Sequence, residues 1–504
     1  MVAQITDMKI NSPAIERVEK DSLGQLQLPA NALYGINVAR SLANFPISGR
    51  SIASWPNFVR AFALVKQAAA RANSEIGCLV EEQAHAIFNA CEGIKAGKYD
   101  DHLVVDMLEG SGGTSTNMNF NEVIANIATK SLQQKLSRHG LPIHPNDHVN
   151  MGQSTNDVLP TAMKLAIYYE MENTAPALLK LADAFAKKRE ELSSDLRLGR
   201  TCLQDAQPMT YGQAFGGYEA VVRRHAQQLD ILRKQFLTLP LGGTAIGTGF
   251  GSRPGYKLAV YRHLSCLLGV LVSPAADPFD AMQNMDTCAR LSAELRNTAN
   301  TLSKISNDFI TLSSGPGGGI GEISLPEVQA GSSIMPGKVN PVIPMAVCQV
   351  AFAIAGNDTS ISMACHQGML EINHFEMVVC DRLLDSIRLL VSAATIFSNR
   401  CVEGLHANKA VSYEHLLASS ALATALVPDL GYARVSSLVR QAKQEQRPFV
   451  QVAIEEGSIS EHDVVKILNR SVQVDEGHVG DQNSNKSSSV EHGRIHDYEG
   501  YILQ

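Results

Sequence analysis

Apolar residues along the chain recur mainly at steps of three or four, which is the spacing of one buried face of an α-helix. The longest such series begins near Asp280 and continues unbroken to Leu312. A seam of this length is typical of a helix in a bundle or coiled coil. Its members are Met282, Met285, Cys288, Leu291, Leu295, Ala299, Leu302, Ile305, Phe309 and Leu312.

Other long stretches that are poor in proline predict further helices. Residues 162–196 and 211–238 each indicate a long helix, and residues 345–400 indicate two or three helices, interrupted at Gly356 and Gly368. Strands do not alternate regularly with helices, which argues against a doubly wound sheet. The pattern therefore predicts a mainly α-helical fold.

Turn-forming residues divide the chain near residues 139–157 and again near 404–430. We expect these turns to separate domains. The expected parts are an N-terminal, mostly helical domain (1–150), a central domain of long helices (151–410), a small C-terminal helical domain (411–473) and a polar, disordered tail (474–504).

Composition excludes several classes of protein. The 504 residues include 43 Lys and Arg against 50 Asp and Glu, a net charge of −7, and one Trp. This mild acidity and the scarcity of aromatic residues argue against nucleic-acid binding. The N-terminus lacks the apolar core of a secretory signal, and no run of about 18 apolar residues occurs. We therefore expect a cytoplasmic protein with no membrane-spanning helix.

The nine cysteines are scattered and form no C-x-x-C pair. This usage argues against both a disulfide framework and a zinc cluster. It is typical of reduced thiols in the core of a protein from a reducing compartment.

Four polar, glycine-bearing segments between the predicted helices carry the candidate chemistry. Their small hydroxyl and amide groups donate hydrogen bonds to an anion without filling much space, and Lys338 adds a positive charge. Together they suit a small dicarboxylate, although turn and cap formation is the simpler explanation for any one segment alone. The segments are 110–122 (GSGGTSTNMNFNE), 150–157 (NMGQSTND), 199–206 (GRTCLQDA) and 331–341 (GSSIMPGKVNP).

Three other motifs match known sites less well. The run 315–321 (GPGGGIG) follows a predicted helix rather than a strand, so we expect a mobile loop there and not a nucleotide site. Residues 331–338 have one residue too many for a phosphate loop, and Val339 stands where Ser or Thr is needed. The nearby prolines make a helical metal pair of His144 and His148 doubtful.

The polar segments resemble the active-site regions of the aspartase/fumarase superfamily, in its class II fumarase and aspartase branch. Residues 331–341 are similar to the superfamily signature, and 113–123 and 145–157 are similar to the other two active-site regions of that branch. Residues 243–249 (GTAIGTG) also match, and the resemblance covers roughly residues 15–470.

The resemblance implies a mainly α-helical subunit of three domains, whose central helices assemble into a homotetramer with a twenty-helix core. It also implies active sites shared between subunits, so that one subunit alone would not fully bury the long seam. The implied reaction is a reversible elimination from a substituted succinate, which releases fumarate and an amine or water. No metal or organic cofactor is implied for this chemistry.

By the same resemblance, Ser332 is the base that removes a very weakly acidic proton next to a carboxylate. Main-chain N–H groups along 333–335 and the charge of Lys338 would favour its alkoxide. The intermediate is an aci-carboxylate dianion, so positioned donors should supply the largest part of catalysis. One substrate carboxylate is expected to bind Lys338, Asn340 and Thr201. The carboxylate that becomes the dianion is expected to bind Thr114, Ser154, Thr155 and Ser333. Asn156 is expected near the leaving group, and Ser115 is a further candidate.

Two positions favour an aspartase over a fumarase. Ser115 and Thr155 have the aspartase form, whereas similar fumarases carry glutamine and a second serine there. Cys202 and Met345 occupy the positions of a His–Glu pair that fumarases use. The sequence therefore favours elimination of ammonia from L-aspartate. The alternatives are a lyase for another substituted succinate with a different amine or a nitro leaving group, a class II fumarase, and an inactive structural protein. Cys202 either changes which leaving group the pocket accepts or only packs against neighbouring side chains.

Overall fold

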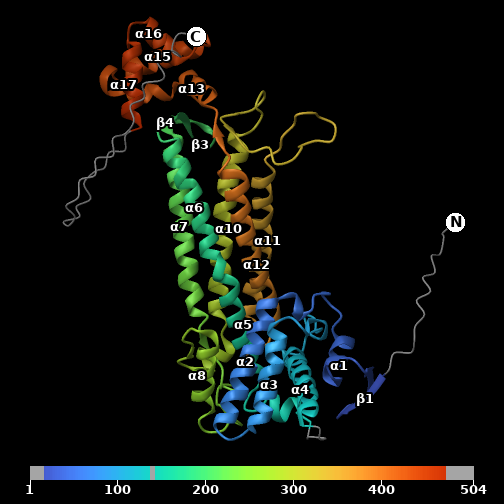
Figure 1. The fold of residues 1–504 in the computed structure, drawn as a ribbon. Coiled ribbons are helices and arrows are strands. Elements are labelled where there is room, and N and C mark those ends of the chain that lie inside the picture. Colours follow the sequence, from blue (N-terminus) through green and yellow to red (C-terminus); the bar gives the residue numbers. More distant parts are fainter. Residues whose placement is uncertain (1–15, 137–141, 473–504) are drawn as a thin grey trace, which may run out of the picture. The chain divides into compact units, whose positions relative to one another are not determined.

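The computed structural model describes residues 16–136 and 142–472, and these residues are mainly α-helical (Figure 1). The predicted tail at 474–504 lies outside them. The helices are α1 (Ile36–Asn44), α2 (Pro56–Glu75), α3 (Glu81–Lys95), α4 (Thr114–Leu136), α5 (Thr155–Glu170), α6 (Thr174–Glu191), α7 (Tyr211–Gln235), α8 (Tyr256–Leu268), α9 (Pro278–Gln283), α10 (Asp286–Leu312), α11 (Val342–Cys365), α12 (Glu376–Phe397), α13 (Lys409–Ala418), α14 (Val427–Leu430), α15 (Tyr432–Glu445), α16 (Phe449–Glu455) and α17 (Glu461–Ser471).

The strands of the described residues form two-stranded pairs only, so the expectation of a mainly α-helical fold without a doubly wound sheet is confirmed. The antiparallel pairs are β1 (Glu16–Asp21) with β2 (Gly24–Pro29), β3 (Leu196–Thr201) with β4 (Gln204–Thr210), and β7 (Ile323–Ser324) with β8 (His406–Ala407). The parallel pair is β5 (Thr238–Leu239) with β6 (Ser273–Pro274).

The chain forms two compact units. Unit 1 comprises Met1–Ala175, Gln227–Asn297 and Phe352–Leu390, and unit 2 comprises Pro176–Ala226, Thr298–Ala351 and Val391–Gln504. Because the chain passes between the units several times, α7, α10, α11 and α12 each contribute residues to both. The domain boundaries proposed above stay a prediction.

The predicted apolar seam is confirmed: all ten members are at most 8% exposed. It runs through α9 and α10, with a break in the helix before Asp286. The expectation that one subunit would leave the seam partly uncovered is wrong. Within unit 2, for example, the ring of Phe309 lies 6.4 Å from that of Phe185 and 5.5 Å from that of Phe397, so neighbouring helices of the same chain cover it.

Helix α11 leaves part of its apolar face open. Phe352 and Met363 are 70% and 65% exposed. Among the described residues, α11 alone is long and apolar enough to cross a membrane by length and composition, contrary to our expectation, and 39% of its apolar window is buried. However, it carries a buried charge: Asp358 accepts a hydrogen bond from Ser292 (2.6 Å) and pairs with Arg296 (2.5 Å). Such a polar network is typical of a helix packed in protein.

Several predicted boundaries differ from the structure. Residues 114–122 lie within α4 rather than between helices, and residues 199–206 belong to the β3–β4 hairpin. The long helix predicted over 162–196 is divided into α5 and α6 by a 3₁₀ turn. Gly356 does not interrupt α11, because a helix tolerates one glycine at a modest cost, whereas the chain does leave the helix near Gly368.

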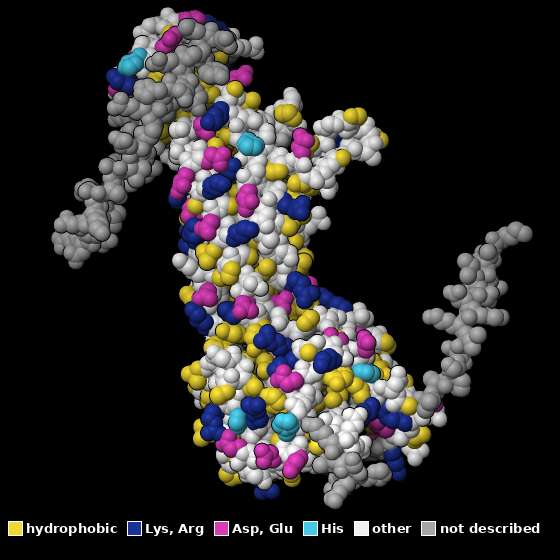
Figure 2. Space-filling view, viewed as in Figure 1, with side chains coloured by type: hydrophobic (Ala, Val, Ile, Leu, Met, Phe, Trp, Pro, Cys, Tyr) yellow, Lys and Arg dark blue, Asp and Glu magenta, His cyan; other side chains and the backbone are white. Residues whose placement is uncertain are grey.

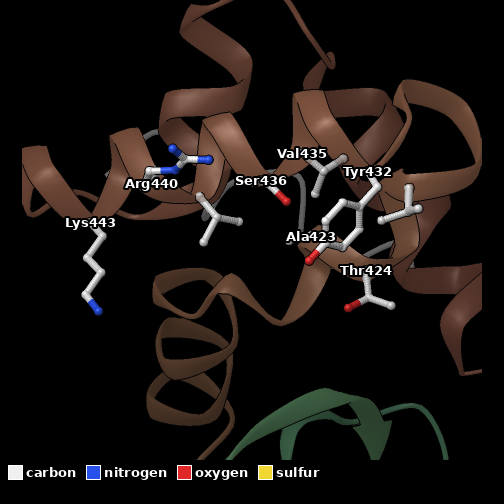
Figure 3. Close-up of a pocket in the computed structure, with 9 residues that line it drawn as sticks. Ala423, Thr424, Tyr432, Val435, Ser436, Arg440 and Lys443 are labelled. Atoms are coloured by element: carbon white, nitrogen blue, oxygen red, sulfur yellow. The ribbon is translucent and has the colours of Figure 1, made fainter.

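The C-terminal helices of unit 2 form a small core and line an open pocket of about 300 Å³ (Figure 3). Its walls include Val435 and Tyr432, and Arg440 and Lys443 lie at its edge. None of the predicted site residues lines it. On the face shown in Figure 2, basic and acidic side chains are interspersed, which agrees with the mild net charge.

Candidate active site

Two helices begin at the predicted binding segments. Thr114 is the first residue of α4, and Ser154 is the N-cap of α5. The Ser154 hydroxyl accepts the Asn156 N–H (3.2 Å), and Asp157 accepts the Ser154 N–H (2.9 Å) in a capping box. Helix N-termini carry partial positive charge and unpaired N–H groups, so both starts suit a carboxylate.

The starts of α4 and α5 lie against each other in unit 1. The Asn117 side-chain amide donates to Thr155 Oγ1 (3.0 Å). Gly113, with φ +85°, makes this approach possible, because a Cβ there would lie 2.1 Å from Leu159 Cδ2. Ser115 is buried beside this contact, and its hydroxyl oxygen accepts a hydrogen bond from Ser111 (2.9 Å).

Asp157 holds the 243–249 segment next to the starts of α4 and α5. Its second oxygen accepts the N–H groups of Gly242 (2.9 Å) and Thr244 (3.0 Å). Burial raises the pKa of Asp157 to about 6, while these N–H groups favour the carboxylate. The Asn156 amide donates to the carbonyl of Ala245 (2.8 Å). Three of the segments singled out in the sequence therefore converge in unit 1.

In the signature loop of unit 2, Ser332 Oγ accepts hydrogen bonds from two main-chain N–H groups. The donors are Ile334 (3.2 Å) and Met335 (3.0 Å). Donors aimed at a hydroxyl oxygen favour its deprotonated form over the neutral one. Of the groups expected to favour an alkoxide, the N–H groups of Ile334 and Met335 are thus hydrogen-bonded to Ser332 Oγ.

The ends of this loop are held together by Gly331. Its N–H donates to the Lys338 carbonyl (2.8 Å), and its carbonyl accepts from the Asn340 amide (2.7 Å). A Cβ at position 331 would lie 2.6 Å from the Lys338 oxygen, so only glycine fits. Ser333 and Lys338 are exposed, and Lys338 has no ion-pair partner in the part of the chain that the structure describes.

Thr201 and Cys202 lie at the tip of the β3–β4 hairpin. Thr201 pairs with Gln204, so Cys202 and Leu203 form a two-residue turn. Their φ angles are +53° and +60°, as a type I′ turn requires. Cys202 is exposed, so within this chain it does not pack against a neighbour. Met345, on the first turn of α11, is 46% exposed.

Glu322 anchors the β3–β4 hairpin to α7 and α13. Its carboxylate, which is fully buried, pairs with Arg200 of β3 (2.6 Å) and lies 3.0 Å from His415 Nδ1 of α13. The Glu322 carbonyl accepts from Tyr211 Oη and from the Asn408 N–H, both at 2.8 Å. One buried residue thus fixes the hairpin that carries Thr201 within unit 2.

The structure divides the predicted site residues evenly. Unit 1 holds Thr114, Ser115, Ser154, Thr155 and Asn156. Unit 2 holds Thr201, Ser332, Ser333, Lys338 and Asn340. Hydrogen bonds join the segments within unit 1.

Comparison with known proteins identifies the family of the chain. A family model described as Lyase matches residues 24–356. An aspartate ammonia-lyase of Pseudomonas canavaninivorans is 44% identical over 453 residues, which are 90% of this chain and 95% of the relative. The chain belongs to the aspartase/fumarase superfamily. A class II fumarate hydratase of Xylella fastidiosa is 38% identical over 92% of this chain and 96% of that protein.

Members of the superfamily also share the fold. The crystal structure of a fumarate lyase:delta crystallin from Brucella melitensis superimposes with a TM-score of 0.85 at 41% identity. The match covers 90% of this chain and 98% of that one. The mainly α-helical fold expected from the resemblance is thereby confirmed.

Within this superfamily site, sequence reasoning missed Lys66, Asn117 and Glu322. Lys66 stands in the apolar stripe of α2, four residues after Phe62, and is fully buried. A lysine on an apolar face is a signal that we passed over. Asn117 lies within the motif at 113–123, but its hydrogen bond to Thr155 depends on how α4 and α5 pack.

We predict that Glu322→Gln destabilises the protein by about 3–5 kcal/mol, because it leaves buried arginine charge without its partner. Urea unfolding of the intact protein measures this change. Glu327→Gln, at an exposed glutamate of the same loop, is the matched control and should be close to neutral. Equal stability of the two variants would show that the buried pair does not hold the hairpin.

Proposed function

We propose that the protein is an aspartate ammonia-lyase, which reversibly converts L-aspartate into fumarate and ammonia. The observation that carries the proposal is Ser332 in the signature loop, its oxygen hydrogen-bonded by two main-chain N–H groups. Relatives named aspartate ammonia-lyase, 42–44% identical over most of their length, support the choice of leaving group.

In the proposed mechanism, the Ser332 alkoxide removes a proton from the carbon beside the carboxylate that lies β to the amino group. The electron pair moves into that carboxylate and gives the aci-carboxylate dianion. The pair then returns, the carbon–nitrogen bond breaks, and ammonia leaves from fumarate. N–H groups held in place at Ser332 before the reaction stabilise its charge without reorganising.

We assign the carboxylate that becomes the dianion to Thr114, Ser154 and Thr155, with Ser333. The starts of α4 and α5 support this assignment, because they present hydroxyls beside two positive helix ends. Lys338, Asn340 and Thr201 hold the other carboxylate. Asn156 lies nearest the leaving group, and Ser115 is a supporting residue, since its hydroxyl is engaged by Ser111.

One observation favours a second candidate, a lyase for another substituted succinate. Cys202 and Met345 replace a polar pair, and Cys202 lies exposed at a hairpin tip. This change lowers the polarity of one corner of the pocket and suits a leaving group other than water. The same two residues argue against a class II fumarase.

We further propose a cytoplasmic homotetramer whose active sites combine residues of several subunits. The open apolar face of α11, with Phe352 and Met363, supports association with further copies of the chain. The division of the site residues between two units of one chain also suits shared sites. We propose no metal or organic cofactor, because side chains supply the base and the donors.

The proposed function predicts that the purified protein forms fumarate from L-aspartate but not from L-malate. Absorbance of fumarate in the ultraviolet measures both reactions in parallel. Turnover of malate alone would contradict the proposal. A folded oligomer that turns over neither substrate would favour the second candidate, a lyase for another substituted succinate.

Ser332→Ala should lower turnover of aspartate by at least about 10²-fold, since the loss of a positioned base costs about 10² to 10⁴-fold. The same preparations should keep the wild-type oligomer size in light scattering. Ser324→Ala, at an exposed serine of β7, is the control and should keep its activity. Full activity of Ser332→Ala would refute the assignment of the base.

Phe352→Glu should dissociate the tetramer, because it places a charge on the open apolar face of α11 without disturbing the core. Sedimentation velocity measures the change in assembly. Leu258→Glu on α8, at a leucine that is 77% exposed, is the control. A tetramer that survives Phe352→Glu would exclude this face as the interface.

A further inference from the structure

Lys66 is a charged group buried in the interior of unit 1. It lies on α2, has no exposed surface, and its ammonium lies 5.7 Å from the centre of the Phe62 ring. A buried ammonium is costly unless its protons are hydrogen-bonded. The structure supplies three acceptors, all of them side-chain amide oxygens.

These acceptors belong to the two binding segments of unit 1. Lys66 Nζ donates to Asn117 Oδ1 (2.8 Å), Asn150 Oδ1 (3.0 Å) and Gln153 Oε1 (3.0 Å). An ammonium only donates, so each amide must turn its oxygen toward Lys66 and its NH₂ group away. Lys66 thereby sets the orientation of all three amides.

The orientation of Asn117 determines the role of Thr155. With its oxygen held by Lys66, the Asn117 NH₂ group points to Thr155 Oγ1 (3.0 Å). A hydroxyl oxygen that accepts a hydrogen bond retains its own proton for donation elsewhere. Thr155 is only partly buried, so that proton is available to a ligand.

The charge of Lys66 acts in the same direction. Burial lowers the pKa of Lys66 to about 7, while Asp157 on α5 and Cys91 on α3 favour the charged form. The three amide oxygens also favour the ammonium. Neutral amides satisfy the charge without cancelling it, so positive potential remains beside Thr155.

We propose that Lys66 is a positioning residue of the elimination, which orients Asn117 so that the Thr155 hydroxyl donates to the carboxylate that becomes the dianion. The proposal rests on the proposed function. It predicts that removing Lys66 weakens binding of the dianion far more than binding of a ground-state dicarboxylate.

The test compares two ligands by titration calorimetry. Succinate is a ground-state dicarboxylate, and the nitronate group of ionised 3-nitropropionate is planar and carries two negatively charged oxygens where the aci-carboxylate intermediate carries its own. Lys66→Met should weaken nitronate binding by about 10²-fold, the usual effect of losing one positioned donor, and succinate binding only a few-fold. Wild type should bind the nitronate more tightly than succinate.

Asn117→Asp tests the same relay without emptying the lysine site. Its carboxylate still pairs with Lys66 but accepts the Thr155 proton, which reverses that hydrogen bond. Nitronate binding should fall about as far as in Lys66→Met. Lys164→Met is the control, because it removes a largely buried lysine of unit 1 that donates to the Thr238 carbonyl (3.0 Å), and it should change neither affinity.

Two outcomes overturn the inference: an unchanged nitronate-to-succinate affinity ratio in Asn117→Asp, or no preference for the nitronate in wild type. If Lys66→Met does not fold, Asn117→Asp decides alone. Turnover of L-aspartate by wild type is recorded separately. Its absence would refute the proposed function, and the affinity ratio would still decide the role of Lys66.

Discussion

The arrangement of unit 1 depends on the burial of one ammonium among amide oxygens. Taking the charge of Lys66 out of water costs several kcal/mol. The fold offsets this cost with three neutral acceptors in direct contact, and Asp157 adds an attraction without forming an ion pair with Lys66. A carboxylate partner would hold the lysine equally well but would cancel its field. Amide partners keep the potential positive beneath the starts of α4 and α5, where an anion is expected.

Unit 2 uses a buried charge in the opposite way. The carboxylate of Glu322 is surrounded by Arg200, Arg197 and His415, so its charge is compensated and it serves as a fixed point. The β3–β4 hairpin is attached to it through Arg200. The hydrogen bonds of the signature loop, by contrast, join residues of the loop to one another, around Gly331 and Ser332.

The sequence allowed us to predict helices whose apolar residues recur at a regular spacing. It did not allow us to predict features that depend on contacts between distant segments. The ten-member seam was found because burial on one face imposes the helical period on every turn of α10. The binding segments were found because their residue types form recognisable motifs. The β3–β4 hairpin was missed because Cys202 and Leu203 are not the Asn and Gly that normally mark such a turn. The contact of Asn117 with Thr155 depends on the approach at Gly113, which no spacing along the chain encodes.

The turn at Cys202 and Leu203 limits which substitutions can stabilise this protein. Two residues with side chains are held there in the left-handed region, at a cost of about 1 kcal/mol or more each. Glycine or asparagine would remove that strain, yet it would also replace the side chain at the tip beside Thr201. Natural sequences tolerate such strain where function requires it. At this hairpin, thermal stability and the chemistry of the proposed pocket set opposite demands on the same two positions.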